Sequence, residues 1–376
     1  MVRVNRIHVP TVLLTLLSAA LLVAAGCTHH DAPITVKAAS DERSEFVGNA
    51  ACAECHAGEF KAHHGSRHDR SLQPATRAAL GRLMPGLGVV PLAGYALAER
   101  EGALTLERQG LGSDKPETQS IQLVLGSGKL GMTFVTLLGD DALMETRMSF
   151  FPPYRLWDIT PGQENKHPGD VPFGRPHTGR EASMCLGCHA TTVPSHLLQI
   201  KPRFYGVGCE ACHGAGTAHI EAMRAKKYGE PHMENLALKS PTQIDELCGK
   251  CHRTAKDVDL QSPEVNLTHR FQPYALQRSA CRTKSNEPLS CLSCHNPHTD
   301  VSTDLKAYER ACLNCHAAPG AVRPTTRIDP TARQARVCPV NKTSGCVGCH
   351  MRPKAAFTQT TIPAKMADHL ISIEKK

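Results

Sequence analysis

The feature that most constrains this chain is a short motif, Cys-x-x-Cys-His, which occurs seven times. Two cysteines separated by two residues and followed at once by a histidine have the spacing of covalent c-type haem attachment. The thiols bond to one porphyrin and the histidine becomes a ligand of its iron. Paired cysteines also build zinc sites, but zinc does not require a histidine directly after the second cysteine. The sequence therefore predicts seven haem c groups.

The predicted haem sites are numbered 1 to 7 along the chain, and together they use fourteen cysteines and seven histidines. The triplets are Cys52, Cys55 and His56; Cys185, Cys188 and His189; Cys209, Cys212 and His213; Cys248, Cys251 and His252; Cys291, Cys294 and His295; Cys312, Cys315 and His316; and Cys346, Cys349 and His350.

The composition offers little material for an ordinary protein core, because only 4% of the residues are aromatic and there is one tryptophan. The porphyrins must then supply much of the buried apolar surface, and folding should depend on them. We expect a mainly α and irregular fold in which short helices and loops wrap around seven haems. Residues 85–165 contain no cysteine and have short alternating runs separated by glycine turns, which predict a small β-hairpin subdomain.

The N-terminus predicts export. Residues 1–26 have two arginines and an apolar run, as in a signal peptide, and the run ends in Val-Ala-Ala-Gly-Cys, which resembles a bacterial lipobox. Cys27 would then carry lipid and hold the protein at the periplasmic face of a membrane, the outer membrane being favoured over the inner, or at the cell surface. Ordinary cleavage and an uncleaved anchor are the alternatives. Residues 27–45 are expected to be a flexible tether, 46–84 the segment of haem 1, and 166–376 the array of haems 2 to 7.

Two of the 17 cysteines remain after haem attachment and lipidation, Cys281 and Cys338. In an oxidising compartment a leftover pair predicts a disulfide. Two buried free thiols, or a thiolate that ligates iron, are the alternatives.

The formal net charge of +8 does not indicate nucleic-acid binding. Two positive charges belong to the signal segment, and the propionates of seven haems bring the mature protein to about −1 when oxidised and about −8 when reduced. The chain also has no runs of Lys and Arg that would form a binding stripe.

Several segments resemble the multihaem cytochrome c superfamily, of the cytochrome c-552/4 type. They are GVGCEACHGAGTAH, CLSCHNPH, the GSRH that follows haem 1, and CVGCHMRPK with a late DHLI. The superfamily includes tetrahaem cytochromes of ammonia oxidisers, pentahaem nitrite reductase and octahaem hydroxylamine oxidoreductase. The resemblance implies a closely spaced haem stack with His68, His219, His298 and His369 as the second, distal iron ligands. Further distal candidates are His177, His269, His232 and His64, the last being a rival of His68 on one helical face.

The chain departs from its relatives in ways that bear on activity. Every motif ends in histidine, whereas many pentahaem nitrite reductases have a Cys-x-x-Cys-Lys site, and no tyrosine cross-link signature of hydroxylamine oxidoreductase is recognisable. We therefore expect an electron-transfer protein that accepts electrons from a quinol-side membrane donor or another cytochrome. One alternative is a reductase or oxidoreductase of a small nitrogen or sulfur oxyanion at one open haem. Another is a subunit of an extracellular cytochrome filament.

Overall fold

The computed structural model describes residues 45–84, 88–90, 94–109, 116–229, 232–258, 270–285, 288–317, 337–357 and 360–373. The predicted signal peptide, Cys27 and nearly all of the tether lie outside these ranges, and so does His269.

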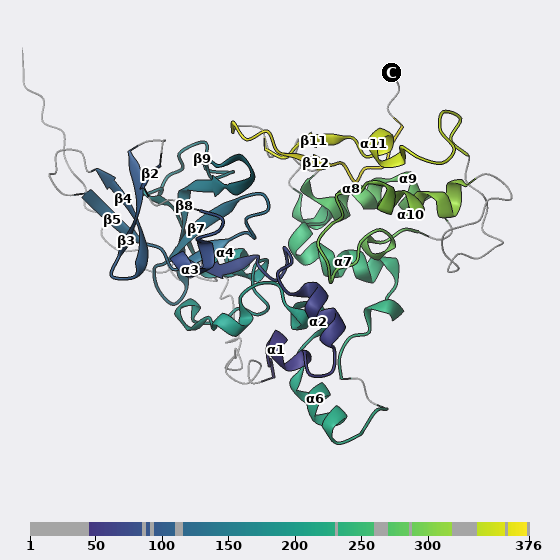
Figure 1. Ribbon diagram of the computed structural model, residues 1–376, viewed down its shortest axis with the longest axis horizontal. Coiled ribbons are helices and arrows are strands. Elements are labelled where there is room, and N and C mark those ends of the chain that lie inside the picture. The colour runs from purple at the N-terminus through teal and green to yellow at the C-terminus, as the bar shows by residue number, and fades with distance from the viewer. Residues whose placement is uncertain are drawn as a thin grey trace, which may run out of the picture. The chain divides into compact units, whose positions relative to one another are not determined.

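In the sequence, two antiparallel sheets come between haem motifs 1 and 2. Figure 1 shows their strands grouped together on the left. The larger sheet has the order β1-β6-β7-β8-β10, and β9 also pairs with β8. Its strands are β1 (Leu72–Pro74), β6 (Leu123–Leu125), β7 (Met132–Leu137), β8 (Ala142–Phe151), β9 (Leu156–Ile159) and β10 (Gly174–Thr178). The smaller sheet has the order β2-β3-β4-β5, with β2 (Gly88–Val90), β3 (Tyr95–Arg100), β4 (Ala103–Gln109) and β5 (Pro116–Ser120). The β structure is thus larger than a hairpin, and it includes strands on both sides of residues 85–165.

Apolar side chains from both sheets form one core, which contains the single tryptophan. Leu97 and Leu106 of the smaller sheet belong to the same buried cluster as Phe134 of the larger one. Trp157 packs on this cluster, with its ring centre 5.4 Å from that of Phe134 and 5.2 Å from that of Phe150. The segment between motifs 1 and 2 therefore has an apolar core of its own.

The haem motifs lie on short helices that bury few of their own side chains. These helices are α1 (Asn49–Cys52), α4 (Gly179–Gly187), α5 (Cys209–His213), α7 (Pro241–His252), η7 (Cys291–Ser293), α10 (Lys306–His316) and α11 (Cys346–His350). Helix α1 has no buried residue, α5 buries only Glu210, and α11 buries only Val347. Because such helices cannot be held by apolar packing of their own, this region needs another source of buried surface.

The remaining helices and strands connect these motifs. They are α2 (Ala57–His63), α3 (Arg77–Leu80), α6 (Thr217–Arg224), α8 (Gln272–Arg278), α9 (Ala280–Thr283), β11 (Pro353–Ala355) and β12 (Lys365–Ala367), with 3₁₀ turns η1 (Pro152–Tyr154), η2 (Leu197–Gln199), η3 (Pro202–Phe204), η4 (Leu236–Leu238) and η5 (Ala255–Asp257). In the part of the chain that the model describes, no helix combines the length and apolarity needed to cross a bilayer.

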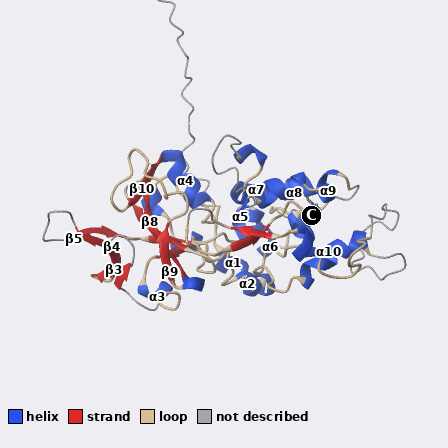
Figure 2. Cartoon of the chain, turned by 90° about the horizontal axis from the view of Figure 1, so that it is seen from above, coloured by secondary structure: helices blue, strands red, loops and turns tan. Residues whose placement is uncertain are grey.

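Helix α4, which carries motif 2, is packed on the larger sheet beside β8 and β10 (Figure 2). Ala182 and Leu186 of this helix are fully buried in a cluster with Leu72, Leu123 and Leu143 of the sheet. The sheet therefore fixes the position of motif 2.

The C-terminal hairpin of β11 and β12 is also attached to the sheet. Phe151, at the end of β8, packs against Ala356 and Ile362. One carboxylate oxygen of Asp158 accepts hydrogen bonds from the backbone N–H and the hydroxyl of Thr361, both at 2.7 Å. These contacts hold the segment that leads to His369.

Candidate haem sites

Four motif histidines each face a histidine from a distant part of the chain. The ring centres are 6.3 Å apart for His56 and His219, and 6.2 Å apart for His68 and His252, His213 and His298, and His295 and His369. The motif histidines in these pairs belong to sites 1, 4, 3 and 5. The structure thus brings each of the four distal histidines implied by resemblance opposite a motif histidine, and it assigns each to a particular site.

The constant separation of these rings fits a metal ion between them. Two imidazoles that bind one metal from opposite sides through bonds of about 2.0 Å have their ring centres roughly 6 Å apart. The angle between the ring planes, in contrast, varies from 10° to 72°. When aromatic rings stack directly, the distance between their centres changes with the angle between their planes. When two rings bind one metal from opposite sides, either ring can rotate about the nitrogen–metal–nitrogen axis without changing that distance. The four pairs therefore have the geometry of bis-histidine haem ligation.

Hydrogen bonds at Nδ1 orient several motif histidines for metal binding through Nε2. His213 donates from Nδ1 to the carbonyl of Glu234 at 2.9 Å, and His189 donates to the carbonyl of Ser71 at 2.9 Å. A carbonyl oxygen can only accept, so the proton is on Nδ1 and the lone pair is on Nε2. This second-shell hydrogen bond is usual for metal-binding histidines.

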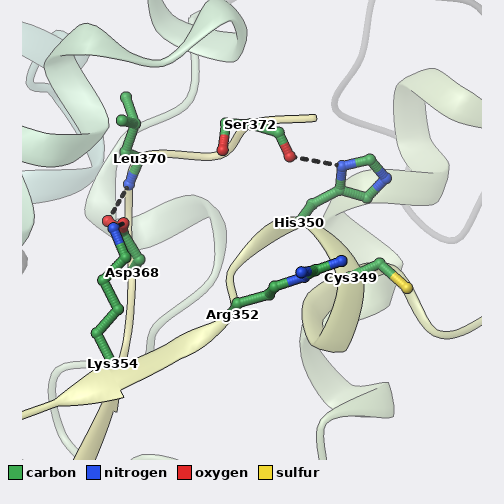
Figure 3. Close-up of a pocket in the computed structure, with 7 residues that line it drawn as sticks. All are labelled: Cys349, His350, Arg352, Lys354, Asp368, Leu370 and Ser372. Atoms are coloured by element: carbon green, nitrogen blue, oxygen red, sulfur yellow. Dashed lines mark hydrogen bonds and ion pairs between the residues drawn. The ribbon is translucent and has the colours of Figure 1, made fainter. Parts of the chain in front are cut away.

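His350 of site 7 shows the same arrangement beside a small pocket (Figure 3). Its Nδ1 donates to the carbonyl of Ser372 at 3.0 Å, and Nε2 points away from the other pocket residues. The pocket is lined by Cys349, His350, Arg352, Lys354, Asp368, Leu370 and Ser372. It lies on the Nδ1 side of the ring, so it is not where an iron bound to Nε2 would be.

Burial lowers the pKa of five motif or distal histidines, because desolvation disfavours the charged ring. The pKa of His369 falls to about 4. The pKa is also below its usual value for His189, His252, His295 and His298, again because of burial. Neutral imidazole is the form that binds a metal, so these rings are ready for ligation.

Cysteine contacts show which motifs are neighbours. The thiols of four pairs of cysteines lie close enough to affect one another's pKa, namely Cys52 and Cys209, Cys188 and Cys251, Cys248 and Cys291, and Cys312 and Cys346. In the second pair, the neighbouring thiol of Cys251 lowers the pKa of Cys188 to about 7, and the pKa of Cys251 is raised in turn. Cys212 also interacts with Cys248, and Cys294 with Cys312. Motif 3 therefore adjoins motifs 1 and 4, motif 4 also adjoins motifs 2 and 5, and motif 6 adjoins motifs 5 and 7.

The other distal candidates are placed differently. The Nδ1 of His64 lies 3.2 Å from a carboxylate oxygen of Asp69, and its exposed ring stacks on Phe60. His177, on β10, has Nδ1 3.5 Å from a carboxylate oxygen of Glu181, while its buried Nε2 has no hydrogen-bond partner. His232 has a positive φ of 51° and lies between α6 and η4. Neither His64 nor His177 stacks on a motif histidine in the described part of the chain.

Cys281 and Cys338 are not bonded to each other in the structure, as the motif cysteines are also not bonded. Cys281 lies in α9 among the cysteines of motifs 5 and 6, and it interacts with Cys315 and Cys294. The Cys338 sulfur accepts a hydrogen bond from the backbone N–H of Asn341 at 3.5 Å. The disulfide expected from the count stays a prediction.

Sequence reasoning missed a buried acid inside motif 3. Glu210 is 2% exposed, and its carboxylate accepts hydrogen bonds from the backbone N–H groups of Val47, Gly48 and Gly216 at 2.8–2.9 Å. It thereby holds the segment before motif 1 against motif 3. A glutamate between two attachment cysteines gives no sign of this in the sequence, because its partners are backbone groups.

Comparisons with known proteins give one family match, over part of the chain, and one similar solved structure. Residues 164–214, which contain motifs 2 and 3, match the family model of cytochrome c554 and c-prime. Among solved structures, the outer cell wall cytochrome OcwA matches with a TM-score of 0.47 and 18% identity, covering 87% of this chain and 79% of that chain. Comparison with curated proteins gives no match. The family match supports a multihaem c-type cytochrome.

Proposed function

We propose that this protein is an exported seven-haem c-type cytochrome that transfers single electrons between redox partners. The observation that carries the proposal is the set of four imidazole pairs, whose 6.2–6.3 Å separation is the same in four different motifs. Haem with two histidine ligands supplies one-electron redox chemistry with no free position for a substrate. The chain's own part is to fix the ligands, bury them and orient their Nε2 atoms.

The cysteine contacts support a continuous relay. They connect the sites in the order 1–3–4–5–6–7, with site 2 as a branch at site 4. Because the attachment cysteines of neighbouring motifs lie near one another, the haems that they would hold could exchange electrons from site to site. Sites 1, 2 and 7 are the ends of this network, so we infer that partners exchange electrons there.

The proposed location and partners follow from the N-terminal sequence. Residues 1–26 would direct export and Cys27 would carry a lipid, most simply in the outer membrane. A protein tethered in this way is suited to receive electrons from a quinol-side donor or another cytochrome. The proposal includes no nucleic-acid partner.

Two measurements on the purified protein test the proposal. Intact mass and haem absorbance should give seven covalent haems per chain, and a smaller number would refute the assignment of the motifs. Electron paramagnetic resonance of the oxidised protein should show low-spin ferric haem at the four sites with paired histidines, which are sites 1, 3, 4 and 5. A high-spin signal that shifts when nitrite, hydroxylamine or a sulfur oxyanion is added would instead establish the oxidoreductase alternative.

A further inference from the structure

Three pairs of motifs share one local geometry. In each pair the first motif is at the C-terminal end of a helix, and the second motif opens a helix at its first cysteine. The pairs are motifs 1 and 3 on α1 and α5, motifs 4 and 5 on α7 and η7, and motifs 6 and 7 on α10 and α11. In all three pairs the first cysteines of the two motifs lie beside each other.

In each pair, the helix that ends in the first motif has a side chain with an acceptor oxygen three positions before the first cysteine of that motif. These residues are Asn49, Asp245 and Glu309. Asn49 Oδ1 accepts a hydrogen bond from the backbone N–H of Cys209 at 2.8 Å, and Glu309 Oε1 accepts one from the backbone N–H of Cys346 at 3.0 Å. Each acceptor thus reaches from one motif to the first cysteine of the next.

These contacts replace the side-chain N-caps that are missing from α5 and α11, the helices that begin at motifs 3 and 7. Helix α5 follows Gly208 and helix α11 follows Gly345, and neither glycine offers a side-chain acceptor. The first N–H groups of a helix have no partner within the helix and need one from elsewhere. Here the partner comes from the neighbouring haem motif, so the cap and the contact between the two motifs are the same interaction.

The middle pair uses the same position with a different contact. Asp245 is fully buried and forms an ion pair with Arg282 at 3.2 Å, and its other carboxylate oxygen lies 3.5 Å from the sulfur of Cys291. Helix η7 has its own capping residue, Ser290. Once Cys291 carries haem its sulfur cannot donate a hydrogen bond, so the arginine remains as the partner of this carboxylate.

We propose that the side chains three residues before the first cysteine of motifs 1 and 6, Asn49 and Glu309, are positioning residues, which fix motifs 3 and 7 and set the geometry of these two haem pairs. The proposal rests on the proposed function, because it concerns the attached haems. The proposal also predicts that the haem pairs differ in reduction potential, because the positioning side chain is charged in one pair and neutral in the other. A carboxylate beside an attachment cysteine, as at Glu309, stabilises the ferric state, whereas the amide of Asn49 does not.

The experiment uses the full-length haem-loaded protein. The variants are Asn49→Ala, Asn49→Asp, Glu309→Ala and Glu309→Gln, and the matched control is Glu246→Ala, which removes an exposed acid next to Asp245. The readouts are the exciton couplet in Soret circular dichroism, which depends on the spacing and angle of neighbouring haems, and spectroelectrochemical potentials.

We expect each alanine variant to lose part of the couplet amplitude, because the geometry of one neighbouring haem pair is disturbed while the other contacts of the array remain. The conservative variants retain an acceptor oxygen and should retain the couplet. Glu309→Gln should in addition raise the reduction potential of the haems at sites 6 and 7, since a negative charge beside them is lost. The control variant should change neither the couplet nor the potentials.

Alanine variants whose couplet and potentials match the control would overturn the proposal. If alanine variants do not mature, Glu309→Gln decides the matter: a native couplet with a raised potential supports the positioning role, and a lost couplet refutes it. A wild-type count below seven haems would instead be a failure of the proposed function, which the mass measurement reveals separately.

Discussion

Glu210 allows a stability prediction that can be worked from its contacts. The carboxylate is buried and joins three segments, namely the start of the described chain, α5 and the turn before α6. Oε1 accepts the N–H groups of Val47 and Gly216, and Oε2 accepts that of Gly48. Removing the side chain leaves three backbone donors without this acceptor.

The two substitutions at this position should differ in cost. A hydrogen bond to a charged group contributes about 1.5–3 kcal/mol, and the three share one carboxylate, so Glu210→Ala should cost about 4 kcal/mol in the free energy of unfolding. Glu210→Gln keeps an oxygen that can accept two of the N–H groups, while its amide NH₂ would face the third. We expect it to cost about 2 kcal/mol.

Denaturant unfolding of the haem-loaded protein, followed by visible circular dichroism, measures both values. The control is Glu221→Ala, which removes an exposed acid from the nearby helix α6 and should change stability by less than about 0.5 kcal/mol. An alanine variant that loses less than about 1 kcal/mol, or a glutamine variant as unstable as the alanine variant, would refute the reasoning.

Three further predictions use other parts of the chain. A Cβ added at Gly208 would lie 2.2 Å from Asn49 Oδ1, so Gly208→Ala should break the contact between motifs 1 and 3 and destabilise the protein by about 1–3 kcal/mol in the same unfolding assay. His219→Ala should convert one low-spin haem to high spin in electron paramagnetic resonance, whereas His196→Ala, which removes a partner of an exposed aspartate, should not. The hydrogen bond from Arg175 lowers the pKa of Asp170 to about 2. The ionised carboxylate therefore stabilises the folded protein above about pH 4, and this stabilisation is lost as the pH falls from about 4 to about 2. Asp170→Asn should remove that part of the acid transition in far-ultraviolet circular dichroism, and an unchanged acid limb would contradict the assignment.

The attachment motifs could be predicted from the sequence because their chemistry is local, but the pairing of ligands could not. His68 follows site 1 closely in the chain, yet its ring faces His252 of site 4. His219, from the segment after site 3, faces His56 of site 1. Resemblance implied that these histidines are ligands, but only the packing of distant segments determines which motif each one meets.

The strands that flank the predicted β region show a similar limit. β1 (Leu-Gln-Pro) and β10 (Gly-Arg-Pro-His-Thr) are short, contain proline and have no apolar alternation. They are strands because β6 and β8 offer them antiparallel partners. Edge strands of this kind are defined by tertiary pairing rather than by propensity, so a sequence pattern underestimates the sheet.

The sheet has a structural part in the haem array although it carries no motif. His369 comes long after the motif histidine it faces, and a free C-terminal segment would lose much conformational entropy on reaching that position. The bond of Thr361 to Asp158 anchors the segment to β9, and the ion pair of Lys354 with Asp368 at 2.6 Å fixes the residue directly before the ligand. Much of that entropy is therefore lost on packing against the sheet rather than on ligation. On this argument, the β structure pre-organises His369 for its position opposite His295.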